Sequence, residues 1–316
     1  MKLGELRKLT RGIGTPEGPG VQKEMEQRML EAGIDPRSFY QELEMTSALV
    51  DTHRDISWSN AKMQLHSHSF YELLWCAECE GVEYLVGSER YRLRKGDLIF
   101  VPPGISHRPL LPEKMEKPYK RYVLWLSPRF MELYAGLYPS PFTDRQAKPS
   151  MLRTGGTHWE RLGELFLAGV RESEQQPDGW EAAVVGNTLT LLTRIKRATD
   201  AQSARHLQAE KPELLDRIMA YVEERYPEDV TLGTVAKECF VSESTVSHLV
   251  KEKLGVSFHR YLTQRRLIGA KKLIAESMEL EEVARCCGFR DYSGFYRAFR
   301  QEFGISPRQY RKLCGG

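Results

Sequence analysis

A stretch of about 27 residues near the C-terminus occurs twice, with an offset of 48 to 49 positions. Both copies carry a short apolar stripe, a turn, a second stripe at helical i, i+3, i+4 spacing, and then glycine, an aliphatic residue and serine. The matched positions are Leu232, Val235, Ala236, Val246, Leu249, Val250, Gly255, Val256 and Ser257 in the first copy, and Leu280, Val283, Ala284, Phe295, Ala298, Phe299, Gly304, Ile305 and Ser306 in the second. Two copies are too few for a solenoid, and each copy predicts a helix-turn-helix unit.

The residues around each turn have the side chains that such a unit needs. Ala236 and Ala284 are small enough to allow close approach where two helices cross. Gly288 suits a helix C-terminus, where a positive φ costs glycine nothing. Ser242 and Asp291 come just before the second helix of each copy, where a side-chain oxygen accepts from unpaired backbone N–H groups. Both second helices therefore have a predicted start.

Charge favours nucleic acid as a partner only when it is counted locally. The whole chain has a net charge of +3, whereas residues 251–316 contain 14 Lys and Arg against 7 Asp and Glu. A solvated helical surface is the alternative interpretation of this local excess. Because the first residues of a recognition helix enter the major groove, we expect base contacts from exposed positions early in each second helix. These positions are Ser244, Thr245, Ser247 and His248 in the first copy, and Tyr292, Ser293, Tyr296 and Arg297 in the second.

Four basic residues have more specific expected roles. Arg297 can pair with guanine through two hydrogen bonds, and a phosphate contact is the alternative for this side chain. Lys251, Arg290 and Arg300 are expected at phosphates, which position a protein on DNA without distinguishing sequence.

Residues 231–312 resemble the C-terminal domain of the AraC/XylS family of transcription regulators. The resemblance rests on residues 288–291 (GFRD), 295–300 (FYRAFR) and 303–311 (FGISPRQYR), with 251–258 (KEKLGVSF) in the first copy. It implies sequence-specific binding to a promoter operator in double-stranded DNA. Two units joined by one linker helix, over about residues 258–276, should address successive major-groove faces about 34 Å apart.

Short β-rich runs alternate with turn signals over about residues 62–126, which predicts a small β-barrel. Within it, residues 66–72 (HSHSFYE) and 96–107 (GDLIFVPPGISH) resemble the two cupin motifs, although the glycine expected soon after the first motif comes only at Gly81. Cupin barrels are the usual N-terminal ligand-binding and dimerisation domain of the AraC family, so the two resemblances agree.

The cupin-like motifs contain residues that can bind a metal ion. His66 and His68 are two apart on a predicted strand and share one face, and Glu72 keeps the same parity. With His107 from a second strand they would form a three-histidine, one-carboxylate set for Zn, Ni, Mn or Fe(II). Two other uses are compatible with the same residues, namely hydrogen bonding to an organic ligand and tying strands together. The expected effector pocket, for a sugar or an aromatic molecule, consists of His66, His68, Tyr71, Glu72, Trp75 and His107.

The rest of the chain divides into segments. Ser127 and Pro128 predict a helix start, with the helix ending at about residue 138, and residues 139–150 are expected to be loop. Two helices over about 157–174 and 179–199 form a hairpin that serves either dimerisation or packing within the monomer. The expected division is an N-terminal extension (1–60) with a charged helix around 21–32, a cupin-like sensor domain (61–150), a helical dimerisation hairpin (151–199), a linker (200–211) and a DNA-binding domain (212–316).

Composition is ordinary for a chain with real cores, at 41% hydrophobic and 28% charged residues. No run approaches the roughly 18 apolar residues that a membrane span needs, and the N-terminus has no apolar signal region. The six cysteines show neither a disulfide nor a zinc-finger framework. These features predict a protein of a reducing cytoplasm, and the resemblance to the AraC/XylS family implies a bacterial protein associated with the nucleoid.

The sequence therefore predicts an α+β protein of two domains, a cupin-type β-barrel with flanking helices followed by an all-α double helix-turn-helix. Its expected function is transcription regulation without catalysis, as a homodimer that binds DNA, responds to a small effector and contacts RNA polymerase. Two alternatives stay open at this level. One is a metal-dependent cupin enzyme with an accessory DNA-binding module, and the other is an architectural DNA-binding protein that needs no ligand.

Overall fold

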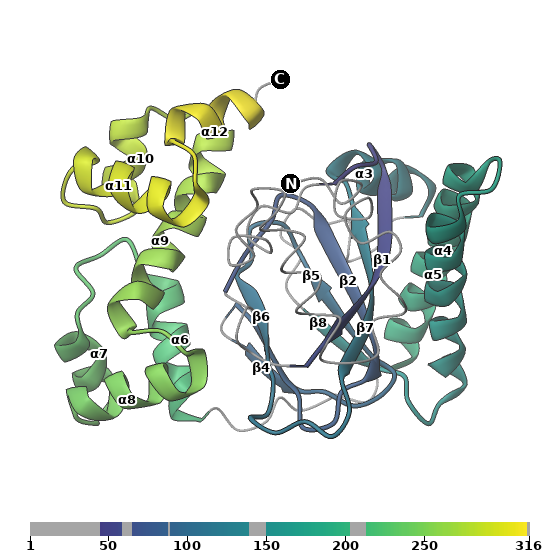
Figure 1. Ribbon diagram of the computed structural model, residues 1–316, viewed down its shortest axis with the longest axis horizontal. Coiled ribbons are helices and arrows are strands. Elements are labelled where there is room, and N and C mark those ends of the chain that lie inside the picture. The colour runs from purple at the N-terminus through teal and green to yellow at the C-terminus, as the bar shows by residue number, and fades with distance from the viewer. Residues whose placement is uncertain (1–44, 59–64, 88, 139–149, 203–212, 315–316) are drawn as a thin grey trace.

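The computed structural model describes residues 45–58, 65–87, 89–138, 150–202 and 213–314 (Figure 1). Its strands are β1 (Val50–Ser57), β2 (Tyr71–Glu78), β3 (Glu83–Val86), β4 (Glu89–Arg92), β5 (Asp97–Val101), β6 (His107–Leu110), β7 (Tyr119–Leu126) and β8 (Ser150–Arg153). Its helices are α3 (Pro128–Leu137), the 3-10 helix η3 (His158–Arg161), α4 (Leu162–Gln175), α5 (Trp180–Gln202), α6 (Leu214–Arg225), α7 (Leu232–Cys239), α8 (Glu243–Leu254), α9 (Phe258–Ala275), α10 (Leu280–Cys286), α11 (Tyr292–Phe303) and α12 (Pro307–Cys314). The predicted α+β architecture is confirmed.

The strands form two sheets that enclose one apolar core. The larger sheet has the order β1-β7-β2-β5-β8 and the smaller one β4-β3-β6. Side chains from both sheets meet in the core, among them Leu74 and Ile99 from the larger sheet and Tyr84 and Val86 from the smaller one. The predicted β-barrel is therefore present as two facing sheets.

The predicted boundaries of the sensor domain are wrong at both ends. Strand β1 falls in the segment expected to be an extension, yet it pairs with β7 from Val50↔Leu126 to Ser57↔Tyr119. Strand β8, expected to open the helical hairpin, pairs antiparallel with β5. Pairing with strands that are distant in the sequence makes each segment part of the sheet, and the local sequence does not display those partners.

Helices α4 and α5 cover the outer face of the larger sheet (Figure 1). The apolar stripes predicted for the hairpin, including Phe166, Val170, Leu191 and Leu192, are buried in one cluster with the outward side chains of β2 and β7. Contact with the sheet is close, because a Cβ at Gly163 would overlap the ring of Trp75. These stripes therefore pack within the monomer, and the face they form is not available for dimerisation.

The C-terminal domain confirms the two predicted helix-turn-helix units, α7–α8 and α10–α11. Ser242 caps α8 by accepting from the N–H of Thr245 at 3.1 Å, and Asp291 caps α11 by accepting from the N–H of Gly294 at 2.6 Å. Gly288 has the expected positive φ, at 80°. Helix α9 joins the two units, as the sequence predicts for about residues 258–276.

Two predicted features, the helix around residues 21–32 and most of the linker, lie outside the described residues. None of the helices in the described ranges is long and apolar enough to cross a membrane.

Candidate DNA-binding face and sensor site

The predicted base-contacting residues lie along the first two turns of α8 and α11, as the caps at Ser242 and Asp291 require. On α8, Ser244, Thr245 and His248 are exposed and Ser247 is half-buried. On α11, Ser293 and Arg297 are exposed, whereas Tyr292 and Tyr296 are half-buried, with ring centroids 6.2 Å apart. The opposite face of each helix is buried. Each helix therefore presents a polar face of the size that a major groove accepts.

The predicted phosphate contacts surround this face. Lys251, Arg290 and Arg300 are all exposed, the first on the last turn of α8, the second just before α11 and the third on the last turn of α11. Long cationic side chains at the edges of a recognition helix can reach the strands that border the groove.

In the barrel, the structure brings together His68, Glu72 and His107. One nitrogen or oxygen from each residue lies within 4.8 Å of the others. His107 Nε2 is 3.1 Å and His68 Nε2 is 3.6 Å from the same oxygen, Glu72 Oε2. All three side chains are nearly or fully buried. The three atoms thus converge on one small volume.

The hydrogen bonds around this site determine which ring nitrogens are free. His68 Nδ1 is 2.7 Å from the carbonyl of Phe70, and His107 Nδ1 is 2.9 Å from the carbonyl of Ile105. A carbonyl only accepts, so both Nδ1 atoms carry hydrogen, and in the neutral form of either ring the lone pair of Nε2 is directed at Glu72. The other oxygen of Glu72 accepts from Trp125 Nε1 at 2.9 Å.

The neutral site therefore has three electron-pair donors facing one another. None of His68 Nε2, His107 Nε2 and Glu72 Oε2 makes a hydrogen bond of good geometry within the described residues. Burial lowers the pKa of His68, and neighbouring Glu72 only partly opposes this shift. Burial would raise the pKa of Glu72, but the hydrogen bonds and positive charge that His107 and His68 supply when they are protonated outweigh it and hold this pKa well below its usual value. A carboxylate beside two Nε2 lone pairs needs a proton or a cation between them, and two nitrogens with one oxygen suit a divalent transition metal.

Three of the predicted site residues are placed differently from the prediction. His66 lies outside the group of converging donor atoms, although its ring centroid is 4.2 Å from that of His107. The prediction of a strand over residues 66–72 is wrong. Strand β2 begins at Tyr71, and His66 lies before it, in an isolated β-bridge to His107. Tyr71 and Trp75 point from β2 into the helical layer, on the face opposite Glu72. The two-residue period of a strand makes this placement unavoidable.

A polar group that the sequence motifs did not predict lies beside the site. His53 from β1 packs edge-on against Trp125 at 4.6 Å, and its Nε2 lies 3.6 Å from Asp55. Asp55 pairs with Arg121 of β7 at 2.8 Å. Burial raises the pKa of Asp55, but His53 and Arg121 outweigh it and lower this pKa overall. His53 and Asp55 are two residues apart on β1 and so share one face of the strand. This alternation could have revealed the group, but the segment was predicted to be an extension.

Fold and sequence motifs together define a two-domain protein with a cupin barrel and a helix-turn-helix DNA-binding domain. A helix-turn-helix domain model matches residues 235–313 and a cupin domain model matches residues 58–116. The HTH-type transcriptional activator RhaS of Salmonella dublin is 30% identical over 257 residues, which cover 78% of this chain and 87% of that protein. RhaS of Salmonella typhi is 29% identical over 256 residues, with the same coverage. The chain belongs to the AraC/XylS family and is a DNA-binding transcription regulator.

Among solved structures, the chain is similar to the C-terminal domain of AraT, a response regulator from Geobacillus stearothermophilus. The identity is 30% and the TM-score 0.32, over 33% of this chain and 88% of that one. It is also similar to ToxT from Vibrio cholerae, with 11% identity and a TM-score of 0.35 over 84% of this chain and 98% of that one.

Proposed function

We propose that this protein is a ligand-responsive regulator that contacts operator bases through α8 and α11. The observation that carries the proposal is the pair of capped helices, each with its polar face exposed and both attached to α9. In this proposal Arg297, with Ser293, Tyr292 and Tyr296, contacts one set of bases. Ser244, Thr245, Ser247 and His248 contact the other set, and Lys251, Arg290 and Arg300 bind phosphates.

The effector site in this proposal is the group His68, Glu72 and His107, with His66 at its edge. A bound divalent metal would supply a positive charge that relieves the repulsion between the three donors and would leave a coordination position for an oxygen-bearing effector. The residues fit such an ion, because both histidines already have their Nδ1 atoms occupied by carbonyls. Tyr71 and Trp75 are not part of this site.

Location and partners are inferred from the same class of protein. We infer that the protein acts in the bacterial cytoplasm on nucleoid DNA, as a homodimer, and the RhaS relatives support activation through RNA polymerase. The dimer interface would use a surface other than the buried stripes of α4 and α5. Molar mass by light scattering tests the dimer, and a value for one chain would contradict it.

The first experiment is selection of bound fragments from genomic and randomised DNA by the purified protein, followed by affinity for the winner and for scrambled DNA at one salt concentration. We expect a site with two base blocks about one helical turn apart and at least about a thousandfold preference over scrambled DNA. The absence of any enriched sequence would contradict the proposal.

Elemental analysis and a substrate panel separate the alternatives. Stoichiometric metal together with turnover of a sugar or an aromatic substrate would favour the cupin enzyme, whose supporting observation is the convergence of His68, Glu72 and His107. Specific DNA binding that no metal and no metabolite alters would instead favour the architectural protein.

A further inference from the structure

The smaller sheet, β4-β3-β6, is a wall shared by the barrel and the DNA-binding domain (Figure 1). On one face, Tyr84 and Val86 of β3 join the core of the barrel. On the other face, Leu85 of β3 and Leu110 of β6 join the core of the first helix-turn-helix unit, together with Leu215 of α6. The DNA-binding domain is therefore docked on the sensor domain through buried apolar side chains.

Arg108 of β6 connects this wall to the first recognition helix. Its Nη1 donates to the carbonyl of Leu254, the last residue of α8, at 2.7 Å. The side chain is only 5% exposed, and burial lowers its pKa to about 10, so the guanidinium is charged at neutral pH. A cation at a helix C-terminus interacts favourably with the helix dipole. The sensor domain thus adds a charged donor at the C-terminus of α8, beside the backbone cap at Gly255.

Arg90 of β4 connects the same wall to the start of α6. It lies 3.0 Å from Asp216 and 2.8 Å from Glu213, both on the DNA-binding domain, and 2.9 Å from Glu83 of its own domain. Burial would lower the pKa of Arg90, but these three carboxylates outweigh it and raise the pKa overall. One guanidinium therefore holds together three carboxylates that would otherwise repel each other across the domain boundary.

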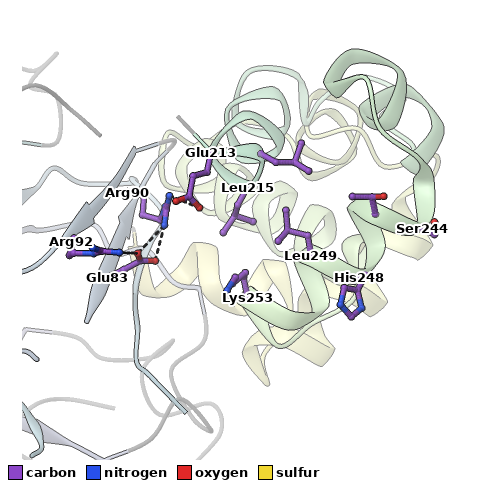
Figure 2. A pocket seen from close by; sticks show the side chains of 11 residues that line it. Glu83, Arg90, Arg92, Glu213, Leu215, Ser244, His248, Leu249 and Lys253 are labelled. Carbon is purple, nitrogen blue, oxygen red and sulfur yellow. Dashed lines mark hydrogen bonds and ion pairs between the residues drawn. The ribbon is translucent and has the colours of Figure 1, made fainter. Parts of the chain in front are cut away.

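A crevice of about 710 Å³ between the domains runs along the flank of α8 (Figure 2). Its helix side includes the predicted base contacts Ser244, Thr245 and His248, and its sensor side includes Glu83 and Arg90. A major groove about 12 Å wide leaves little room around an inserted helix, so a sugar-phosphate strand must run close to each flank. In the docked arrangement one of those strands would meet the sensor sheet, whose side chains already line the crevice.

We propose that Arg90 and Arg108 form an interdomain lock that holds α8 in a low-affinity state for DNA. The lock rests on the proposed role of α8 in base contact. Undocking would free the flank of α8 and expose both guanidinium groups to water. If about one molecule in ten is undocked, the apparent affinity for the operator is about tenfold below that of the released form.

The test compares the full-length double variant Arg90→Ala/Arg108→Ala with wild-type protein. We expect the double variant to bind the selected operator about tenfold more tightly. X-ray scattering without DNA should show a larger radius of gyration, because the two domains separate. Arg92→Ala is the matched control, since Arg92 lies on the same strand and lines the same crevice. Its side chain is 65% exposed, and its contact with Glu83 is long, at 3.9 Å. It should leave the radius unchanged and should not tighten binding.

The single variant Arg90→Ala controls for damage to α8, because it keeps the hydrogen bond from Arg108 to the carbonyl of Leu254. It should tighten binding severalfold. Unchanged or weaker operator binding by this variant, with its melting temperature preserved, would overturn the lock. An unchanged radius of gyration in a folded double variant would also overturn it, independently of DNA. Failure of wild-type protein and all variants to bind any selected DNA would contradict the proposed function itself.

Discussion

The two helix-turn-helix units share one plan but differ in what completes their cores. Equivalent positions are aliphatic in the first unit, with Val246, Val250 and Leu254, and aromatic in the second, with Phe295, Phe299 and Phe303. The core of the first unit continues into the sensor domain, whereas that of the second consists of residues from α9 to α12 and their connecting loops. The difference indicates that the first unit buries part of its apolar surface against the sensor domain, whereas the core of the second is completed within the DNA-binding domain.

Loss of a core side chain is the strongest way to test this contrast. Phe299→Ala should lower the free energy of unfolding by about 3–5 kcal/mol, because the ring is fully buried among other aromatic side chains. Val250→Ala at the equivalent position should cost about 2 kcal/mol. Urea denaturation of full-length variants measures both. Equal losses at the two positions would contradict the view that the cores differ.

The helix C-terminal glycines give a second comparison. Gly288→Ala should destabilise the protein by about 2 kcal/mol or more, because φ is +80° and the new Cβ would lie 2.7 Å from the carbonyl oxygen of Pro227. Gly255→Ala has a similar φ of +70° but no atom within 4 Å, so about 1 kcal/mol is expected from strain alone. Thermal melting distinguishes them, and a larger loss at Gly255 would show that the backbone at Tyr226 and Pro227, just after α6, can move aside.

Base contact should also be unequal between the units. Arg297→Ala should cost about 1–3 kcal/mol of operator binding and relax the preference at one base pair, because a guanidinium can bond guanine twice. His248→Ala should cost less than about 1 kcal/mol, since an imidazole cannot donate two parallel hydrogen bonds to one guanine as a guanidinium can. Affinities for operators mutated at each position measure this. Equal losses on specific and random DNA for Arg297→Ala would assign it to phosphate.

Phosphate contacts should have the smallest effect and the least sequence dependence. Lys251→Ala and Arg300→Ala should weaken binding to all DNA alike and lower the slope of log affinity against log salt by about 0.9 each. Titrations from low to moderate salt provide the slopes. A variant that keeps the wild-type slope would show that its residue does not contact DNA.

Local patterns predicted the DNA-binding domain well. The caps at Ser242 and Asp291 and the glycine at 288 depend on neighbours within a few residues, which a sequence displays directly. The sensor domain was harder, because membership of β1 and β8 in the sheet depends on partners far along the chain.

The sensor site was only partly predictable for the same reason. Alternation along β2 places Glu72 on the barrel face and Tyr71 and Trp75 on the opposite face, against the helices. The predicted pocket was chosen by residue type and ignored this alternation. The contacts of Arg90 and Arg108 across the domain boundary carry no local signature at all.

The order of residues along β6 limits how this protein can be redesigned. His107 faces the donors in the barrel, and Arg108, the next residue, faces the end of α8. A substitution that moves β6 to suit a new effector also moves Arg108, which donates to the last carbonyl of α8. Under the proposed function and the proposed lock, ligand preference and basal promoter occupancy cannot be tuned separately at this strand, and a library that varies the pocket should vary the docking surface with it.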